Sequence, residues 1–79
     1  MSKVTVYSTP TCPWCYKTKD FLKENNIPYQ DFNVAADHKA AQDMIEKSGQ
    51  MGVPVIDIDG QIIVGFDKNA LKKALKIGQ

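Results

Sequence analysis

The order strand, helix, strand at the start of the chain constrains its fold more than any other feature of the sequence. Residues 3–8, Lys-Val-Thr-Val-Tyr-Ser, have the β-branched and nearly continuous apolar pattern of a central strand that is covered on both faces. Residues 29–34 form a second strand-like run, and the segment between the two is helical in pattern. Two strands joined through a helix in this way are parallel, and their crossover is right-handed. This start predicts an α/β protein.

The helix between these strands is expected to begin at Pro13, because the missing N–H of proline costs nothing in a first helical turn. It is expected to end at Asn25-Asn26, because Pro28 prevents its continuation. Its apolar face is predicted to consist of Trp14, Thr18, Phe21 and Leu22. The chain therefore passes from the first strand into this helix through a short turn.

The second half of the chain predicts a helix, a hairpin and a further helix. Asp37 is a candidate N-cap or first-turn acid of a helix that ends at Ser48-Gly49. Asp59-Gly60 separates the β-type runs 55–58 and 61–64, which is a strong signal for a two-residue hairpin. The stripe that marks the last helix consists of Ala70, Leu71, Ala74 and Leu75.

The complete order is β-α-β-α-β-β-α, in which a parallel pair of strands is extended by an antiparallel hairpin. This order predicts a four-stranded mixed sheet flanked by three helices. A chain of 79 residues can build one modest core and no second lobe. Residues 1–79 are therefore expected to form a single domain.

Charge and hydrophobicity exclude several classes of protein. Ten Lys and Arg residues and nine Asp and Glu residues give a formal net charge of +1. Proteins that bind nucleic acid or an anionic membrane through electrostatic attraction have a larger positive charge. The apolar runs are too short to cross a bilayer, and no apolar segment typical of a signal peptide precedes the first strand. We therefore expect a cytoplasmic monomer without nucleic-acid or membrane partners. A structural disulfide is not expected in that reducing compartment.

The segment Cys-Pro-Trp-Cys at residues 12–15 contains the two cysteines of the chain, at the predicted turn from strand to helix. The Cys12 sulfur would lie at the helix N-terminus, where unpaired N–H groups and the helix dipole favour a thiolate. Lys17 and Lys19 either add positive potential there or are solvated surface lysines. Cys15 lies one turn further along and is expected to be more buried. The sequence therefore predicts that Cys12 attacks a substrate disulfide and that Cys15 resolves the mixed disulfide.

Two other uses of these cysteines compete with this interpretation. A zinc site needs four ligands, and the chain offers two cysteines and His38, which is expected to be a solvated residue of a first helical turn. We therefore expect no metal site within one chain, and an iron–sulfur or metal carrier that shares its ligands between chains is an alternative function. The cysteines could also be inert core thiols, but Cys-x-x-Cys beside a βαβ pattern is typical of a redox pair.

Two further segments could form a binding groove. Val53-Pro54, after Gly52, is compatible with a cis bond that directs the Val53 backbone toward an extended peptide-like substrate; the alternative is a trans proline that only begins an edge strand. Residues 65–67, Gly-Phe-Asp, open the last helix, where backbone N–H groups could hold a carboxylate. Asp67 could hold an ammonium group, or it could only cap that helix.

Three motifs together resemble, in their order and spacing, those of the glutaredoxin family of the thioredoxin fold; they are Thr11-Cys12-Pro13-Trp14-Cys15, Val53-Pro54 and Gly65-Phe66-Asp67. The resemblance covers nearly the whole chain. It implies a thioredoxin-like fold, a cis Pro54 and a dithiol oxidoreductase that reduces protein disulfides and glutathione mixed disulfides. Glutathione would be the co-substrate, no cofactor would be tightly bound, and the partners would be disulfide-containing client proteins and the glutathione reductase system.

The resemblance also implies a glutathione site, and its residues would be Thr11, Trp14, Lys39, Val53, Pro54, Gly65, Phe66 and Asp67. In that site the Val53 backbone pairs with the cysteine of glutathione, and the Phe66 N–H and the Asp67 carboxylate receive its γ-glutamyl end. A basic residue of the second helix, Lys39 or His38, meets the glycine carboxylate.

The sequence departs from the common glutaredoxin pattern at three positions. Many family members have a lysine where Thr9 stands, a threonine where Gly52 stands, and a tyrosine or phenylalanine where Trp14 stands. The missing lysine removes a contact worth about 1 kcal/mol for an exposed ion pair, whereas Asp67 favours glutathione. Residues 65–66 followed by a helix also resemble the glutaredoxin-like electron donors of ribonucleotide reductase, which thioredoxin reductase reduces. Glutathione and thioredoxin reductase are therefore alternative reductants.

Overall fold

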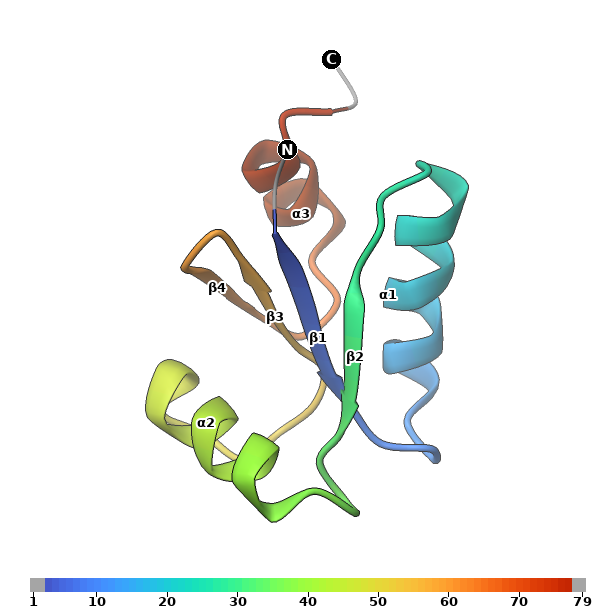
Figure 1. Ribbon diagram of the computed structural model, residues 1–79. Coiled ribbons are helices and arrows are strands. Elements are labelled where there is room, and N and C mark those ends of the chain that lie inside the picture. Colours follow the sequence, from blue (N-terminus) through green and yellow to red (C-terminus); the bar gives the residue numbers. More distant parts are fainter. Residues whose placement is uncertain (1–2, 78–79) are drawn as a thin grey trace.

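The computed structural model describes residues 3–77 and contains the strands and helices in the predicted order (Figure 1). The elements are β1 (Val4–Ser8), α1 (Pro13–Glu24), β2 (Gln30–Asn33), α2 (His38–Ser48), β3 (Val55–Ile58), β4 (Gln61–Val64) and α3 (Lys68–Leu75). The second strand is shorter at both ends than residues 29–34. Within residues 3–77, no helix is long and apolar enough to cross a bilayer.

The strands form one mixed sheet in the order β2-β1-β3-β4. The β1 and β2 strands are parallel, which confirms the prediction from the strand–helix–strand start of the sequence. The β3 strand pairs antiparallel with both β1 and β4. The β1 strand therefore lies inside the sheet and has a hydrogen-bonded neighbour on each side.

The side chains of β1 alternate between two hydrophobic clusters, which explains its nearly continuous apolar pattern. Val4 and Val6 belong to a cluster that also contains Leu22 of α1 and Leu71 of α3. Tyr7 belongs to a second cluster, which also contains Ala40, Met44 and Val55. Because successive strand residues point to opposite faces, α1 and α3 cover one face of the sheet and α2 packs on the other.

Side-chain caps set the starts of α2 and α3. The Asp37 carboxylate accepts a hydrogen bond from the Ala40 N–H at 3.0 Å, and the Asp67 carboxylate accepts one from the Ala70 N–H at 3.0 Å. Gly49 follows the last residue of α2 with a left-handed φ of 76°, a conformation that glycine adopts without steric cost. The predicted caps at Asp37 and Asp67 and the predicted end of α2 are confirmed.

The β3–β4 hairpin turns through Asp59-Gly60, as the sequence predicts. Both residues have positive φ angles, 52° and 92°, which are the angles that a two-residue type I′ hairpin requires at its two central positions. The Gly60 N–H donates to the Asp57 carboxylate at 2.8 Å, so a strand side chain also holds the turn.

The predicted apolar face of α1 is wrong at one position. Trp14 is 55% exposed, and the buried face consists of Cys15, Thr18, Phe21 and Leu22. Trp14 is on the same side of the helix as Phe21, two turns away, but it stands in the first turn, at the end of the helix, where it stacks on Phe66. The indole therefore lies outside the core, and the second cysteine takes the core position.

The Leu71→Ala variant tests the core beneath α3. The Leu71 side chain is fully buried in the hydrophobic cluster that α1, α3 and the sheet share, so its truncation is expected to lower the free energy of unfolding by about 2–5 kcal/mol. Leu75→Ala is the matched control, because Leu75 is in the same helix but only half-buried; it should cost about half as much or less. Urea unfolding measures both, and equal losses would contradict the assignment of Leu71 to the core.

Candidate redox site

Cys12 caps the N-terminus of α1 with its side chain. Its backbone is extended, with φ −100° and ψ 107°, and its sulfur accepts a hydrogen bond from the Cys15 N–H at 3.1 Å. The Cys12 carbonyl accepts from the Tyr16 N–H at 3.3 Å, which begins the helical ladder. The sulfur thus occupies the place where unpaired N–H groups and the helix dipole favour negative charge.

Cys15 lies in the first turn of the same helix and points into the core. It is 0% exposed, whereas Cys12 is 9% exposed, and both are free thiols. Burial, followed by the hydrogen bond with Cys12, raises the pKa of the Cys15 thiol to about 12. The two thiols are therefore chemically unequal in the way that the sequence predicts: one is at the helix end and one is shielded behind it.

The strand register brings the three predicted motifs to one edge of the sheet. Tyr7, near the end of β1, is opposite Val55, which in turn is opposite Val64. The turn that leads to Cys12 leaves this edge after β1, the Val53-Pro54 segment enters β3 at the same edge, and residues 65–67 leave β4 there (Figure 1). Segments far apart in the sequence thus meet beside the N-terminus of α1.

The Val53-Pro54 bond is cis, as the resemblance implies. Pro54 is fully buried, and its carbonyl accepts a hydrogen bond from the Gly65 N–H at 2.8 Å. Gly65 has a left-handed φ of 78°, which a side chain would strain. Val53 is half-buried, and within residues 3–77 no hydrogen bond engages its backbone N–H or carbonyl. This segment is therefore joined to the start of the last helix while the backbone of Val53 is available.

Aromatic side chains connect the starts of α1 and α3. Trp14 stacks on Phe66 with a centroid distance of 6.5 Å, and Phe66 in turn meets the edge of Phe21 at 6.3 Å. The Lys17 ammonium lies 4.4 Å from the centre of the Trp14 ring. The exposed indole therefore forms an apolar surface directly beside the cysteines, between Lys17 and residue 66.

The remaining predicted site residues have different surroundings. Thr11 is exposed next to Cys12, and Asp67 is exposed with one carboxylate oxygen used by the cap of α3. Lys39 lies in the first turn of α2, where it lines a cavity of about 270 Å³ with Tyr7 and Phe32. Neither cysteine lines that cavity. The structure therefore gathers Thr11 and Asp67 with the motifs at the sheet edge, and Lys39 lines a neighbouring cavity that Tyr7 of β1 shares.

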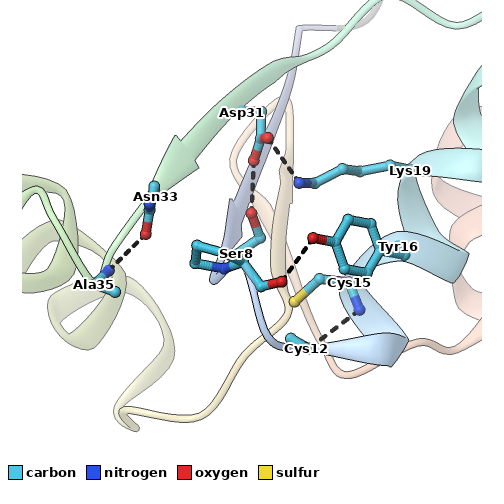
Figure 2. A network of polar contacts seen from close by, with 9 residues as sticks. Ser8, Cys12, Cys15, Tyr16, Lys19, Asp31, Asn33 and Ala35 are labelled. Atoms are coloured by element: carbon cyan, nitrogen blue, oxygen red, sulfur yellow. Dashed lines mark hydrogen bonds and ion pairs between the residues drawn. The ribbon is translucent and has the colours of Figure 1, made fainter.

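Polar side chains that form no motif in the sequence surround Cys15. Lys19 of α1 forms an ion pair of 2.8 Å with Asp31 of β2, and the Ser8 hydroxyl donates to the same carboxylate at 2.7 Å (Figure 2). The Tyr16 hydroxyl donates to the Pro10 carbonyl at 2.6 Å and closes the turn before the cysteines. The spacing of four residues between Cys15 and Lys19 is the one sequence signal for this cluster, because such residues are neighbours on a helix.

A cluster suited to a metal is not found in the part of the chain that the structure describes. No group of three or more His, Cys, Asp or Glu side chains in residues 3–77 could hold an ion. His38 is exposed at the start of α2. The cysteine pair is thus accompanied by helix N–H groups and a lysine rather than by further ligands.

Comparisons with known proteins agree with this geometry. The family model for glutaredoxin matches residues 4–63. An uncharacterized glutaredoxin-like 8.6 kDa protein of the rubredoxin operon of Clostridium pasteurianum is 55% identical over 73 residues, which are 92% of this chain and 97% of the relative. Glutaredoxin 3 of Escherichia coli (strain K12) is 34% identical over 67 residues, which are 85% of this chain and 81% of the relative.

A solved structure confirms the fold. The crystal structure of a mutant of the thioredoxin-like protein BC3987 superimposes with a TM-score of 0.91 and 36% sequence identity, and the match covers 99% of this chain and 100% of that chain. The predicted thioredoxin-like architecture, a four-stranded mixed sheet with three helices, is therefore confirmed.

Alkylation of the Cys12→Ser variant tests the environment of Cys15. Burial, the main cause of the raised pKa of Cys15, persists in this variant. Because only the thiolate reacts, the rate of iodoacetamide labelling should be low at neutral pH and rise about tenfold per pH unit without a plateau up to about pH 10. Mass spectrometry follows the labelling. A plateau at the pH of an ordinary free cysteine, about 8.5, would contradict a shielded Cys15.

Proposed function

This chain belongs to the glutaredoxin family, and from that premise we propose that it is a dithiol glutaredoxin, a thiol–disulfide oxidoreductase that is reduced by glutathione. The observation that carries the proposal is the pair of unequal thiols on the first turn of α1. Cys12 holds its sulfur against the Cys15 N–H at the helix end, and Cys15 lies behind it in the core. A helix end that favours a thiolate supplies a nucleophile, and the shielded thiol supplies a resolving group.

The proposed reaction has two displacements on sulfur. In the first, the Cys12 thiolate attacks a client disulfide, a bond forms between Cys12 and one client sulfur, and the other client sulfur leaves as a thiolate. In the second, the Cys15 sulfur attacks Cys12, the intramolecular disulfide forms, and the client leaves fully reduced. Two molecules of glutathione then restore the two thiols and leave as glutathione disulfide.

The segments at the sheet edge support glutathione as the reductant. The free backbone of Val53 can pair with the cysteine residue of the tripeptide in β fashion. The Phe66 N–H and the second carboxylate oxygen of Asp67 can receive the two charged groups of its γ-glutamyl end, and Trp14 offers an apolar wall. Thr11, Pro54 and Gly65 shape the same edge, whereas the contact between Lys39 and the glycine carboxylate stays a prediction.

A second candidate is a redoxin that a thioredoxin reductase reduces. Thr9, directly after β1, stands where many glutaredoxins have a lysine, so one cationic contact to a glutathione carboxylate is absent. Both candidates use Cys12 and Cys15 in the same roles and differ in the reductant. For either, we propose a monomer of one domain in the reducing cytoplasm, where thiols persist.

Serine variants of the two cysteines test the assigned roles. Cys12→Ser is expected to abolish reduction of both protein disulfides and glutathione mixed disulfides, because it removes the nucleophile. Cys15→Ser should keep the reduction of glutathione mixed disulfides within about twofold and slow the reduction of protein disulfides at least about tenfold, because only the latter needs a resolving thiol. Steady-state rates on a glutathionylated peptide and on an insulin disulfide measure the split. Dithiol activity in Cys12→Ser would reject the assignment.

A direct comparison of reductants separates the two candidates. With NADPH in both assays, glutathione plus glutathione reductase should support turnover, and thioredoxin reductase alone should not. Asp67→Asn sharpens the test, because asparagine caps a helix as well as aspartate does but lacks the charge. It should raise the KM for glutathione about two- to fivefold, the range of an exposed ion pair, and leave thermal stability unchanged. Faster turnover with thioredoxin reductase would favour the redoxin.

A further inference from the structure

A partly buried lysine lies one helical turn after the shielded cysteine. The Lys19 side chain is only 16% exposed, although lysines are mostly solvated. Its ammonium is 2.8 Å from the Asp31 carboxylate, and the other oxygen of that carboxylate accepts from the Ser8 hydroxyl. The ring of Tyr16 lies beneath the same ammonium, at 5.4 Å from its centre. Figure 2 shows this chain of contacts running from α1 across to β1 and β2 beside the two cysteines.

The contacts of Lys19 keep it charged in this position. Burial is the largest single influence and lowers the pKa of Lys19, but the hydrogen bond and the charge of Asp31 act against it, and the net pKa lies above the ordinary value. The charge of Tyr29 when ionised and that of Cys15 act in the same direction. The lysine is therefore a fixed cation at neutral pH and cannot serve as a base that removes protons.

Lys19 stands one helical turn after Cys15 on the same side of α1. Burial, followed by the hydrogen bond with Cys12, raises the pKa of the Cys15 thiol, and the positive charge of Lys19 is a smaller influence that lowers it. The other cations of this helix are placed differently. Lys17 lies over the Trp14 ring, and Lys23 is in the last turn, two turns beyond Cys15.

We propose that Lys19 stabilises the thiolate of Cys15 in the resolving step and that Asp31 is the residue that positions Lys19 for this task. The inference rests on the proposed dithiol function. It assigns the lysine to the second displacement rather than to the activation of Cys12. A fully buried thiol is a poor nucleophile, and a partly buried cation one helical turn away favours the charge that its sulfur carries during the attack.

The step is balanced as follows. Cys15 gives its proton to water, and its sulfur then carries a negative charge beside the Lys19 ammonium. A bond forms between the sulfurs of Cys15 and Cys12, and the bond between Cys12 and the client sulfur breaks. The electron pair leaves on the client sulfur, which takes a proton from water. Cys15 is oxidised, the client sulfur is reduced, and no net proton is consumed.

A two-phase reaction with dithiobis(nitrobenzoate) isolates this step. Attack by Cys12 releases one coloured nitrothiolate at a rate that depends on reagent concentration, and attack by Cys15 releases the second at a rate that does not. In Lys19→Met the second phase should be about tenfold slower, the low end of the effect of one opposite charge on a neighbouring ionisation. The first phase should stay within about twofold, because the helix end that holds Cys12 is unchanged. Stopped-flow absorbance resolves the two phases.

Three further variants separate charge from packing. Lys19→Arg keeps the charge and the bond to Asp31, so its second phase should recover to within about threefold of the wild type. Lys23→Met removes the same charge from the same helix at an exposed position and should leave both phases unchanged. Asp31→Asn should slow the second phase in the wild type but add nothing to Lys19→Met, because it acts through the lysine.

The pH dependence of the second phase separates an electrostatic role of Lys19 from a purely structural one, because a purely structural role would not shift this pH profile. The second phase speeds up with pH as Cys15 ionises, so the loss of the cation should displace its profile toward higher pH. The titratable groups around this pair are Cys12 at the start of α1, Tyr16 on α1, Asp31 of β2 and Tyr29 before it, and none of them is altered in Lys19→Met.

The outcomes distinguish this inference from the proposed function. If the wild type releases no second nitrothiolate, the dithiol function itself is wrong. If the wild type shows both phases and Lys19→Met changes neither, or slows both equally, the dithiol function stands and the role of Lys19 is rejected. A selective loss in the second phase, restored by arginine and shifted in pH, supports the inference.

Discussion

The hydrogen bond from the Cys15 N–H to the Cys12 sulfur is the contact on which the site depends. It joins the helix cap and the redox pair in one structure, because the sulfur that satisfies a backbone donor at the helix end is also the proposed nucleophile. The same geometry orders the two thiols. The capping Cys12 keeps 9% of its surface exposed, whereas Cys15, three positions later, turns fully into the core.

The sheet gives this contact its surroundings. The β1 strand is held on both sides by neighbouring strands and on both faces by hydrophobic clusters, so its end is a fixed point from which the turn to Cys12 departs. The antiparallel register then brings the segments before β3 and after β4 to that point, where the bond between Gly65 and Pro54 joins them. The polar chain of Ser8, Asp31 and Lys19 ties α1 to the parallel pair on the other side of Cys15.

The parts of the fold that local rules decide could be predicted from the sequence. Caps at Asp37 and Asp67, the Asp59-Gly60 hairpin and the parallel crossover all follow from short-range backbone geometry. The predictions that were wrong or missing concern which side chains of a helix pack against the rest of the fold. The apolar pattern placed Trp14 in the core, but the packing of α1 chose Cys15 and left the indole exposed on Phe66. Lys19 could not be distinguished from a solvated lysine until its partner on β2 was known.

By itself, the sequence determined the order of the elements, the strand-to-helix turn that holds two cysteines and the approximate charge of the chain, because each of these depends on neighbouring residues. The tertiary structure decided how completely Cys15 is buried, that Trp14 is exposed beside it, and that Lys19 pairs with Asp31 of β2. The physical reason is that burial and ion pairing arise between segments distant in sequence, and only the packed sheet and helices set the distances over which charge and desolvation act.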